Sequence, residues 1–337
     1  MNTIIGLIII AIGSMGQSSS YVPINKVKDW SWENFWLVQG VFAWLVFPVL
    51  GALLANSAPE LMQIYGANAG AAWQSVGYGV LWGIGGLTFG LSMRYLGIAL
   101  GQSVALGTCA AFGTLIPAVI AGENLFSPKG LVLLLAVAVT LVGIALVGYA
   151  GSLRSKNMSE EKRKKAIKDF ALKKGLLIAL FAGVMSACFS LGLSAGIPVK
   201  EASIAMGAKE IFAQNPVIGG FFTNLVYCLY MNAKNKTSGE IFKTSKSVLV
   251  NNLLFCALAG LLWYSQFFGL GMGQSFFEPN SVMMAFSWSI LMSLNVVFSN
   301  VWGIILKEWK GAGNKAIVYL SIGMAVLIFS LIIPNLF

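Results

Sequence analysis

Long apolar runs separated by short polar connections make up most of this chain. A helix that crosses a bilayer needs about 20 predominantly apolar residues, and ten stretches meet this requirement. They cover residues 3–22, 35–56, 71–93, 96–120, 130–150, 175–197, 212–232, 248–273, 281–306 and 315–336. None of the connections is long enough for a soluble domain. The pattern therefore predicts an all-α polytopic membrane protein with ten transmembrane helices.

The basic residues divide unevenly between alternate connections. Counted from the N-terminus, the odd-numbered connections hold 19 of the 22 Lys and Arg residues, and the even-numbered ones hold 3. Cytoplasmic loops of membrane proteins carry an excess of Lys and Arg. The odd-numbered connections are therefore predicted to be cytoplasmic, which places both termini outside.

The largest basic cluster, Arg154 to Lys174, holds nine of these residues and joins two groups of five spans. Because five is an odd number, the second group enters the membrane from the opposite side, which is the geometry of an inverted repeat. We expect a first five-helix repeat at 1–150, a basic cytoplasmic linker at 151–174 and a second repeat at 175–337. Weak internal similarity, Gly13-x-Met15 against Gly183-x-Met185, supports this division.

Composition agrees with lipid as the solvent of this chain. Charged residues make up 10% of it and hydrophobic residues 57%, whereas soluble domains carry about 25% charged residues; the mean hydropathy is +0.80. The net charge of +10 lies in connections rather than on a folded basic domain, so no nucleic-acid partner is expected. The first apolar run lacks a basic leader and a small-residue cleavage site, which predicts a retained helix rather than a signal peptide.

The residues that usually carry metal or catalytic chemistry are scarce. All four cysteines lie inside apolar runs and the chain has no histidine, so no metal site or cofactor is expected. No nucleophile–base arrangement or mid-membrane carboxylate pair suggests an enzyme, and no soluble signalling domain suggests a sensor.

Polar and aromatic side chains inside the apolar runs are candidates for a binding cavity, because such groups are expensive in hydrocarbon. Amides can pair with adjacent hydroxyl groups, and indoles can cover the C–H face of a sugar ring. The pattern favours a neutral, hydroxylated ligand. The candidates for substrate binding are Gln17, Tyr21, Gln39, Trp44, Trp82, Gln102, Tyr264, Gln266 and Asn295. Hydrogen bonding between helices and aromatic residues at the lipid interface are the alternative interpretations.

A proton-coupled transporter needs a group that binds and releases a proton, and a carboxyl group can do this. The acidic residues nearest to the apolar runs lie close to helix ends. Together with one arginine they are the candidates for proton coupling or gating: Glu33, Arg94, Glu123, Glu278 and Glu308. An ordinary charge at a helix end or in a loop is the alternative interpretation, and for each carboxylate it is the favoured one.

Several blocks of sequence are similar to a known family. They include Lys26-x-Lys28-x-Trp30-Ser31-Trp32-Glu33, Trp263-Tyr264-x-Gln266 and Leu306-Lys307-Glu308-Trp309. Together, from the first span to the tenth, they resemble the L-rhamnose–proton symporter family of the drug/metabolite transporter superfamily. The segment from Gly86 to Gly90 departs from the family pattern as we interpret it, and so does the start of the ninth span.

The resemblance implies two inverted five-helix halves in a bacterial inner membrane. It also implies uptake of a 6-deoxyhexose together with a proton by alternating access. An exporter or uniporter of another small neutral metabolite is the alternative, since related folds serve many solutes. The exact sugar, the coupling ion, the proton-carrying carboxylate and the oligomeric state stay open at this point.

Overall fold

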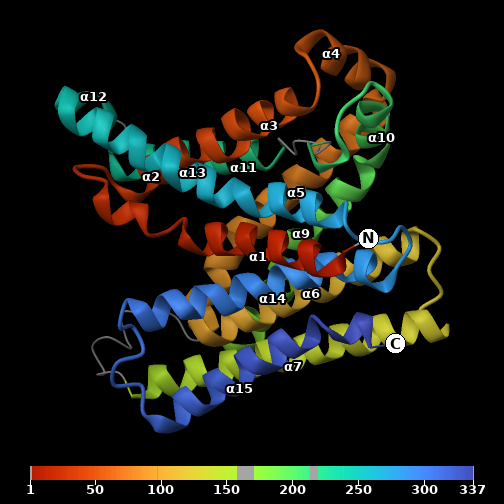
Figure 1. Ribbon diagram of the computed structural model, residues 1–337. Helices are drawn as coiled ribbons and strands as arrows, with labels where there is room; N and C mark the ends of the chain where they lie inside the picture. Colours follow the sequence, from red (N-terminus) through yellow and green to blue (C-terminus); the bar gives the residue numbers. More distant parts are fainter. Residues whose placement is uncertain (1, 97, 158–170, 213–218, 238, 337) are drawn as a thin grey trace. The chain divides into compact units, whose positions relative to one another are not determined.

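The computed structural model describes residues 2–96, 98–157, 171–212, 219–237 and 239–336 (Figure 1). Within these ranges all the regular structure is helical, as the apolar pattern predicts. The main helices are α1 (Thr3–Ser19), α2 (Trp32–Val41), α3 (Phe47–Ala55), α4 (Ala58–Ala67), α5 (Ala69–Leu96), α6 (Ile98–Ile120), α7 (Pro128–Lys156), α9 (Leu172–Ala195), α10 (Ile197–Ala205), α11 (Gly219–Asn235), α12 (Glu240–Lys243), α13 (Lys246–Gln274), α14 (Val282–Ile305) and α15 (Asn314–Ser330).

Nine segments of the described chain are long and apolar enough to cross a membrane, and each overlaps one of the ten predicted spans. The predicted span 212–232 is the exception. It includes residues 213–218, which lie outside the described chain, and its described part forms the 17-residue helix α11. The chain is therefore a multi-pass membrane protein, and the structure accounts for nine of the ten expected spans.

Besides the four-residue α12, two helices occur where the sequence suggested only connections or helix ends. Helix α4 fills most of the second connection, and the Ser57 N–H at its start donates a hydrogen bond to Glu60 Oε2 at 2.8 Å. Helix α10 continues the sixth span after a break at Gly196, with Pro198 near its start. Both helices begin with the sequence features typical of helix N-termini, a Ser cap or an early proline.

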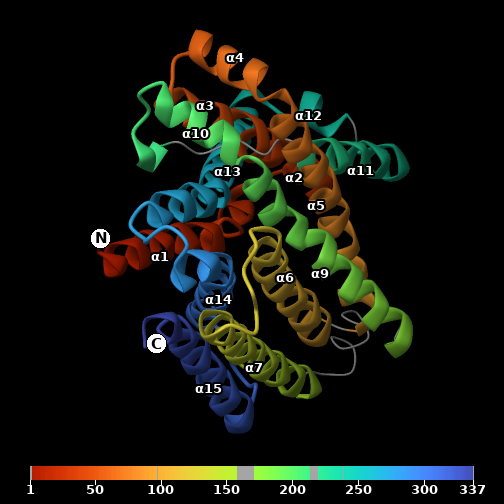
Figure 2. The same ribbon diagram turned by 90° about the vertical axis from the view of Figure 1, so that its right-hand side faces the viewer.

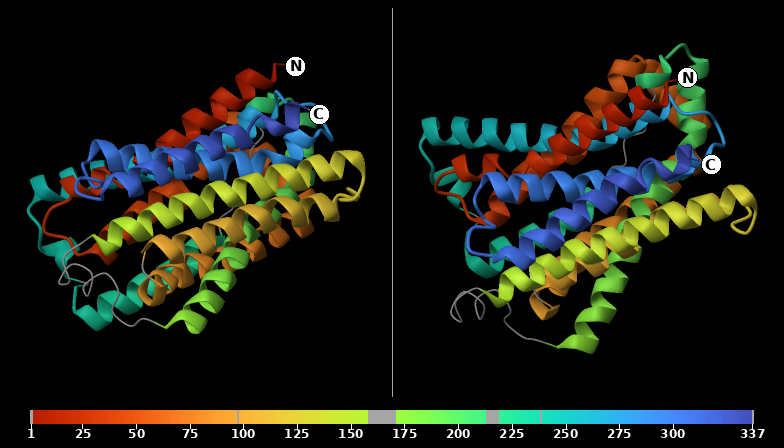
Figure 3. Two further views of the ribbon diagram at one scale, coloured as in Figure 1. Left: turned by 90° about the horizontal axis from the view of Figure 1, so that it is seen from below. Right: turned by 60° about the horizontal axis from the view of Figure 1, so that its bottom comes forward.

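The chain folds into two compact units, and each combines segments from both halves of the sequence. Unit 1 contains residues 84–191 and 277–337 with the first two residues of the chain; unit 2 contains 3–83 and 192–276. Within unit 1, α7 packs along α15, and α6 packs against both α7 and α14. Helices α7 and α15 lie side by side in every view of Figures 1, 2 and 3.

Unit 2 is built around the contact between α1 and α13, which run side by side (Figure 1). Glycines let the two backbones approach closely, as is common between membrane helices. A Cβ atom on Gly13 would lie 2.7 Å from the carbonyl oxygen of Ser265, and one on Gly273 would lie 2.6 Å from that of Gly6. Ser265 Oγ also lies 3.2 Å from the carbonyl oxygen of Gly13, at hydrogen-bond distance.

The second span contains one turn of π-helix, η2 (Phe42–Val46), between α2 and α3. Pro48 explains this turn, because it has no N–H to donate to the carbonyl group four residues earlier. The Phe47 N–H bonds instead to Phe42 O, five residues back. Such π-turns are frequent at functional sites. The proline therefore produces a local widening of the helix at Trp44 rather than a break in the span.

We predict that Gly13→Leu destabilises the protein by about 1–3 kcal/mol or more, because the new side chain meets the backbone of α13. Unfolding in detergent can be followed by the reaction of a thiol dye with the four cysteines, all of which are buried in the structure. Gly77→Leu on α5 is the matched control, since a Cβ atom there has open space around it. Equal melting temperatures for the two variants would contradict the proposed packing.

Candidate functional site

Three tryptophans meet in unit 2, and each comes from a different span. Trp44 lies in η2, Trp82 on α5 and Trp263 on α13. Their ring centroids are 6.0 Å apart for Trp44 and Trp82, 5.8 Å for Trp44 and Trp263, and 5.6 Å for Trp82 and Trp263. We call these residues the tryptophan triad. All three lie near the middle of their candidate membrane spans.

The local sequence of the second span positions the first member of the triad. Trp44 is 3% exposed, and its ring packs on Gly40, where a Cβ atom would collide with it. The π-turn caused by Pro48 carries the indole at this point. Gly260 on α13 allows a close approach of the same segment, since a Cβ atom there would lie 2.9 Å from the Ala43 nitrogen. The glycines and the proline together determine where this indole lies.

Unit 2 also contains buried polar side chains. Gln266 is 4% exposed, and its Nε2 donates to the carbonyl oxygen of Trp263 at 3.1 Å. Gln39 is 2% exposed and lies one helical turn before Trp44, but its Oε1 has no partner in the described structure. The hydroxyl oxygen of Ser14, on α1, is also buried without a partner there. Unpaired buried polar atoms are costly, so Gln39 and Ser14 are candidates for contact with a hydrogen-bonding ligand.

Other sequence candidates in unit 2 have different surroundings. Tyr21 is exposed and its ring lies 6.5 Å from that of Trp36, in a parallel arrangement. The hydroxyl group of Tyr264 lies against Gly51 of α3, and its ring is 6.3 Å from Phe268. Gln17 is half-buried on α1, with its Oε1 3.4 Å from Ser18 Oγ.

The remaining polar candidates, Gln102 on α6 and Asn295 on α14, are half-buried and belong to unit 1. Several hydrogen bonds join neighbouring helices there. Trp288 Nε1 donates to Cys109 O at 3.2 Å, Ser190 Oγ donates to Gly113 O at 2.6 Å, and Thr114 and Ser289 share a 2.7 Å bond. For these helices the alternative interpretation of the polar residues, hydrogen bonding between helices, describes the structure well. A groove of about 480 Å³ between α6 and α7 contains none of the predicted site residues.

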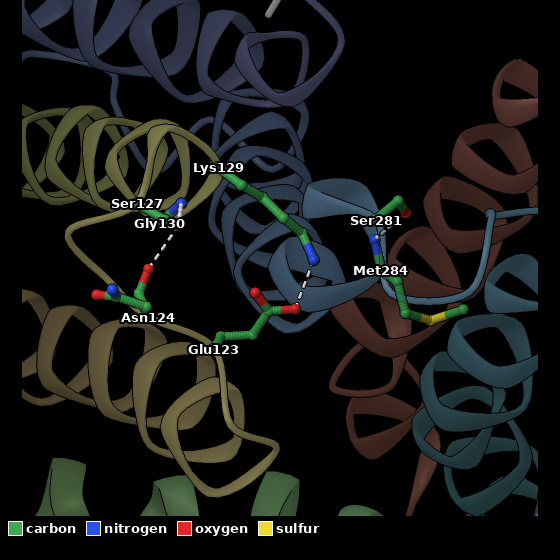
Figure 4. A network of polar contacts seen from close by, with 7 residues as sticks. All are labelled: Glu123, Asn124, Ser127, Lys129, Gly130, Ser281 and Met284. Atoms are coloured by element: carbon green, nitrogen blue, oxygen red, sulfur yellow. Dashed lines mark hydrogen bonds and ion pairs between the residues drawn. The ribbon is translucent and has the colours of Figure 1, made fainter.

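The candidate acidic residues differ sharply in environment. Glu123 forms an ion pair with Lys129 beside the capped start of α7, where Ser127 Oγ accepts a bond from Gly130 N–H (Figure 4). Glu308 is exposed and lies 3.6 Å from Arg154 Nη1, while Glu278 is exposed in the connection before α14. The side chain of Arg94 lies outside the described part of the structure.

Glu33 is the buried member of the set, at 5% exposed. Its Oε1 accepts hydrogen bonds from Asn235 Nδ2 at 2.8 Å and from Thr237 Oγ1 at 2.9 Å. Sequence reasoning missed both partners, because they lie about 200 positions away in an ordinary polar connection. It also missed Ser14, and it noted Trp263 in a family block without counting it among the candidate binding residues.

These observations define the class: a multi-pass helical membrane protein whose unit 2 contains a cluster of tryptophans and buried amides. The family model for L-rhamnose-proton symport protein (RhaT) matches residues 1–336. The L-rhamnose-proton symporters of Yersinia pestis (strain Pestoides F) and of Yersinia pseudotuberculosis serotype O:1b (strain IP 31758) are both 36% identical to the chain over 338 residues. These alignments cover 97% of this chain and 96% of each relative.

The chain therefore belongs to the L-rhamnose-proton symport family, and the resemblance predicted from its sequence blocks is confirmed. The family is one of transporters and not of enzymes.

Two buried amides of unit 2 provide a test of the unpaired acceptor. We predict that Gln39→Leu leaves the melting temperature unchanged or raises it, since it removes an unpaired polar atom. Asn252→Leu should cost about 1–3 kcal/mol, the usual penalty for leaving buried partners unsatisfied. Asn252 accepts from Lys28 N at 3.0 Å and donates to Lys28 O at 2.7 Å. A loss of stability in Gln39→Leu as large as in Asn252→Leu would show that Gln39 is structural.

Proposed function

We propose that this protein takes up L-rhamnose together with a proton across a bacterial inner membrane, by alternating access. The observation that carries the proposal is the family match over residues 1–336, joined by relatives named L-rhamnose-proton symporter that align over nearly their whole length. A match of this extent includes all the spans, rather than one shared motif.

The tryptophan triad suits a 6-deoxyhexose. Such a sugar has an apolar C–H face and a methyl group, which pack well against indoles, and hydroxyl groups that pair with amides. We place the sugar at the triad, with Gln39 and Ser14 supplying their unpaired acceptors and Gln266 a further amide. Gln17, also on α1, is the additional contact that the sequence favours. Hydroxyl donors on the sugar would satisfy atoms that the protein leaves without partners.

We further propose ten transmembrane helices arranged as two inverted five-helix repeats, 1–150 and 175–337, joined by the basic linker 151–174. Helix pairing supports this. If the spans are numbered in order, with α11 as the seventh, the packed pairs are five with ten (α7, α15), four with nine (α6, α14), two with seven (α2, α11) and one with eight (α1, α13). In two five-helix repeats each span corresponds to the span five positions later. The first three pairs therefore stay the same when each helix is exchanged for its counterpart in the other repeat.

The pair formed by spans one and eight should then have a counterpart in spans six and three. Helices α9 and α5 fill this role, because a Cβ atom on Gly85 of α5 would lie 2.5 Å from Ser186 N of α9. In the pair of spans one and eight, the corresponding close contact is that of Gly16 on α1 with Ser265 on α13. Ser186 follows Gly16 by the same offset of 170 that relates Gly183 to Gly13. This arrangement also explains why each compact unit combines segments from both halves.

The orientation of the proposed repeats follows from the charges. Cytoplasmic odd-numbered connections put both termini outside, so the loop that carries Lys26 and Lys28 and the segment between α11 and α12 face the cytoplasm. Among the four candidate carboxylates, Glu123 and Glu308 have cationic partners and Glu278 is exposed. Glu33 is the buried carboxylate, and its partners are an amide and a hydroxyl.

The test of the function is the pH outside lightly buffered, energy-depleted cells that express the protein. Adding L-rhamnose should make the medium more alkaline, because each sugar carries a proton inward. Glucose, and the same strain without the protein, should give no change. Entry of L-rhamnose without a pH change would indicate a uniporter or another coupling ion. If L-rhamnose neither enters nor moves protons, the proposed substrate is wrong.

A further inference from the structure

A polar network at one end of unit 2 holds the start of α2 to the segment that connects α11 with α12. We call it the α2 latch and define it by Ser31, Glu33 and Asn34 on one side and Asn235, Thr237 and Glu240 on the other. In its first half, Glu33 Oε1 accepts hydrogen bonds from Asn235 Nδ2 at 2.8 Å and from Thr237 Oγ1 at 2.9 Å. These bonds join parts of the chain about 200 residues apart.

The second half of the latch uses the other carboxylate. Glu240 Oε2 accepts from the Ser31 N–H at 2.6 Å and from Asn34 Nδ2 at 2.8 Å. Burial on its own would raise the pKa of the Glu240 carboxyl, but the bonds from Ser31 and Asn34 outweigh it and hold the pKa below its usual value. Asn34 Nδ2 also lies 3.1 Å from Thr237 O. This half is therefore maintained in the ionised form near neutral pH.

Glu33 and Glu240 have no ion-pair partner in the described chain. The charged groups on the elements packed around them are Lys26, Lys28 and Asp29 before α2, Lys234, Lys236 and Lys243 on or beside α11 and α12, and Lys246 on α13. The partners of Glu33 are neutral donors rather than a lysine. Glu33 also lies in the first turn of α2, and this end of a helix favours negative charge. Loss of its charge would therefore act directly on the bonds across the latch.

The Thr237 hydroxyl has a choice of two acceptors. Its Oγ1 lies 2.9 Å from Glu33 Oε1 and 2.7 Å from Asn232 Oδ1, yet a hydroxyl group has a single proton to donate. An ionised carboxylate is the stronger acceptor, so the proton points across the latch while Glu33 is charged. Once Glu33 is protonated, Asn232 on α11 is the better acceptor, and one of the two bonds to Glu33 is lost.

The latch also contains a buried acceptor without a partner in the described structure. Asn34 is fully buried, and its Oδ1 has no partner in the described structure although its Nδ2 is bonded across the latch. An unpaired buried amide oxygen is unusual. The latch therefore contains one hydrogen-bond acceptor that its ionised form leaves unused.

We propose that Glu33 binds the coupled proton and that its protonation releases the start of α2 from the α11–α12 segment. The proposal rests on proton symport as the proposed function. In the predicted topology the latch lies at the cytoplasmic end, so the ionised protein is held closed on that side. The protonated protein opens there, which is the direction in which a symporter delivers its sugar and its proton.

Cys228 provides a reporter of opening, because it is 1% exposed on α11, the helix that ends at the latch residue Asn235. In a protein with Cys109, Cys188 and Cys256 changed to alanine, maleimide labelling of Cys228 in membranes can be followed between pH 5 and 8. Each rate is divided by that of the denatured protein at the same pH, because thiol reactivity itself depends on pH. The normalised rate should rise as the pH falls.

Glu33→Gln imitates the protonated residue. It should raise the normalised rate at pH 8 by about tenfold, since charge-assisted bonds are roughly twice as strong as neutral ones, and it should remove the pH dependence. Glu201→Gln, an exposed carboxylate on α10, is the matched control and should behave like the parent. Asn235→Ala, which leaves the carboxylate in place, should also raise labelling at pH 8 and serves as the second variant should Glu33→Gln fail to fold.

Transport provides the readout for the proton itself. Glu33→Gln should retain exchange of L-rhamnose between the two sides of the membrane but lose the alkalinisation of the medium. Labelling like that of the parent, or alkalinisation that persists in Glu33→Gln, would overturn the proposal. The labelling experiment needs no sugar, so a parent protein that opens with acid but does not transport L-rhamnose would refute the proposed function while leaving the latch intact.

Discussion

In a lipid bilayer a buried hydrogen-bonding group has no water to pair with, so its partner must come from the protein. The described structure meets this requirement through the backbone hydrogen bonds of its helices and through side chains that bond to backbone groups. The Asn252 side chain bonds to the backbone N–H and the carbonyl oxygen of Lys28, and Ser190 Oγ donates to Gly113 O. Against this background, the buried atoms without partners stand out, and Gln39 Oε1, Ser14 Oγ and Asn34 Oδ1 are among them. We interpret the first two as sugar contacts and the third as part of a proton site.

Close helix packing is the second constraint, and it determines where the tryptophan triad lies. Apolar side chains gain little from leaving lipid for protein, so helices associate through small residues that allow backbone contact. The glycines between α1 and α13 create such an interface, and Gly260 does the same for the second span. Pro48 then adds the π-turn that carries Trp44. The aromatic site thus depends on residues that do not themselves touch its rings.

The periodicity of apolar residues predicted most of the fold, because the length of a membrane span is imposed by the bilayer rather than by distant contacts. The family blocks predicted the class of transporter. Helix α4 was missed because its ten residues are too short to span and too polar to resemble the other helices. The sequence singled out Trp44, Trp82 and Gln266 but also Tyr264, since residue type does not reveal that its hydroxyl group lies at Gly51.

The difference between the four glutamates could not be predicted for a related reason. All four lie near helix ends, but what separates Glu33 is a pair of neutral donors from the far half of the chain. Pairing between residues 200 positions apart follows from tertiary structure, and nothing in the local composition around Asn235 or Thr237 marks them. Glu123, by contrast, bonds to Lys129 six positions away, a contact within the range that local sequence can indicate.

The most direct test of the account is the electrical current produced when L-rhamnose is added rapidly to liposomes that contain the purified protein. The account predicts that positive charge enters with the sugar. It also predicts that Trp82→Leu reduces the current at low sugar concentration by about tenfold, through lost contact with the sugar ring. Trp73→Leu, at a 73% exposed position on the same helix, should leave the current unchanged. Absence of any sugar-induced current, or equal currents in the two variants, would contradict a proton symporter that binds its sugar at the tryptophan triad.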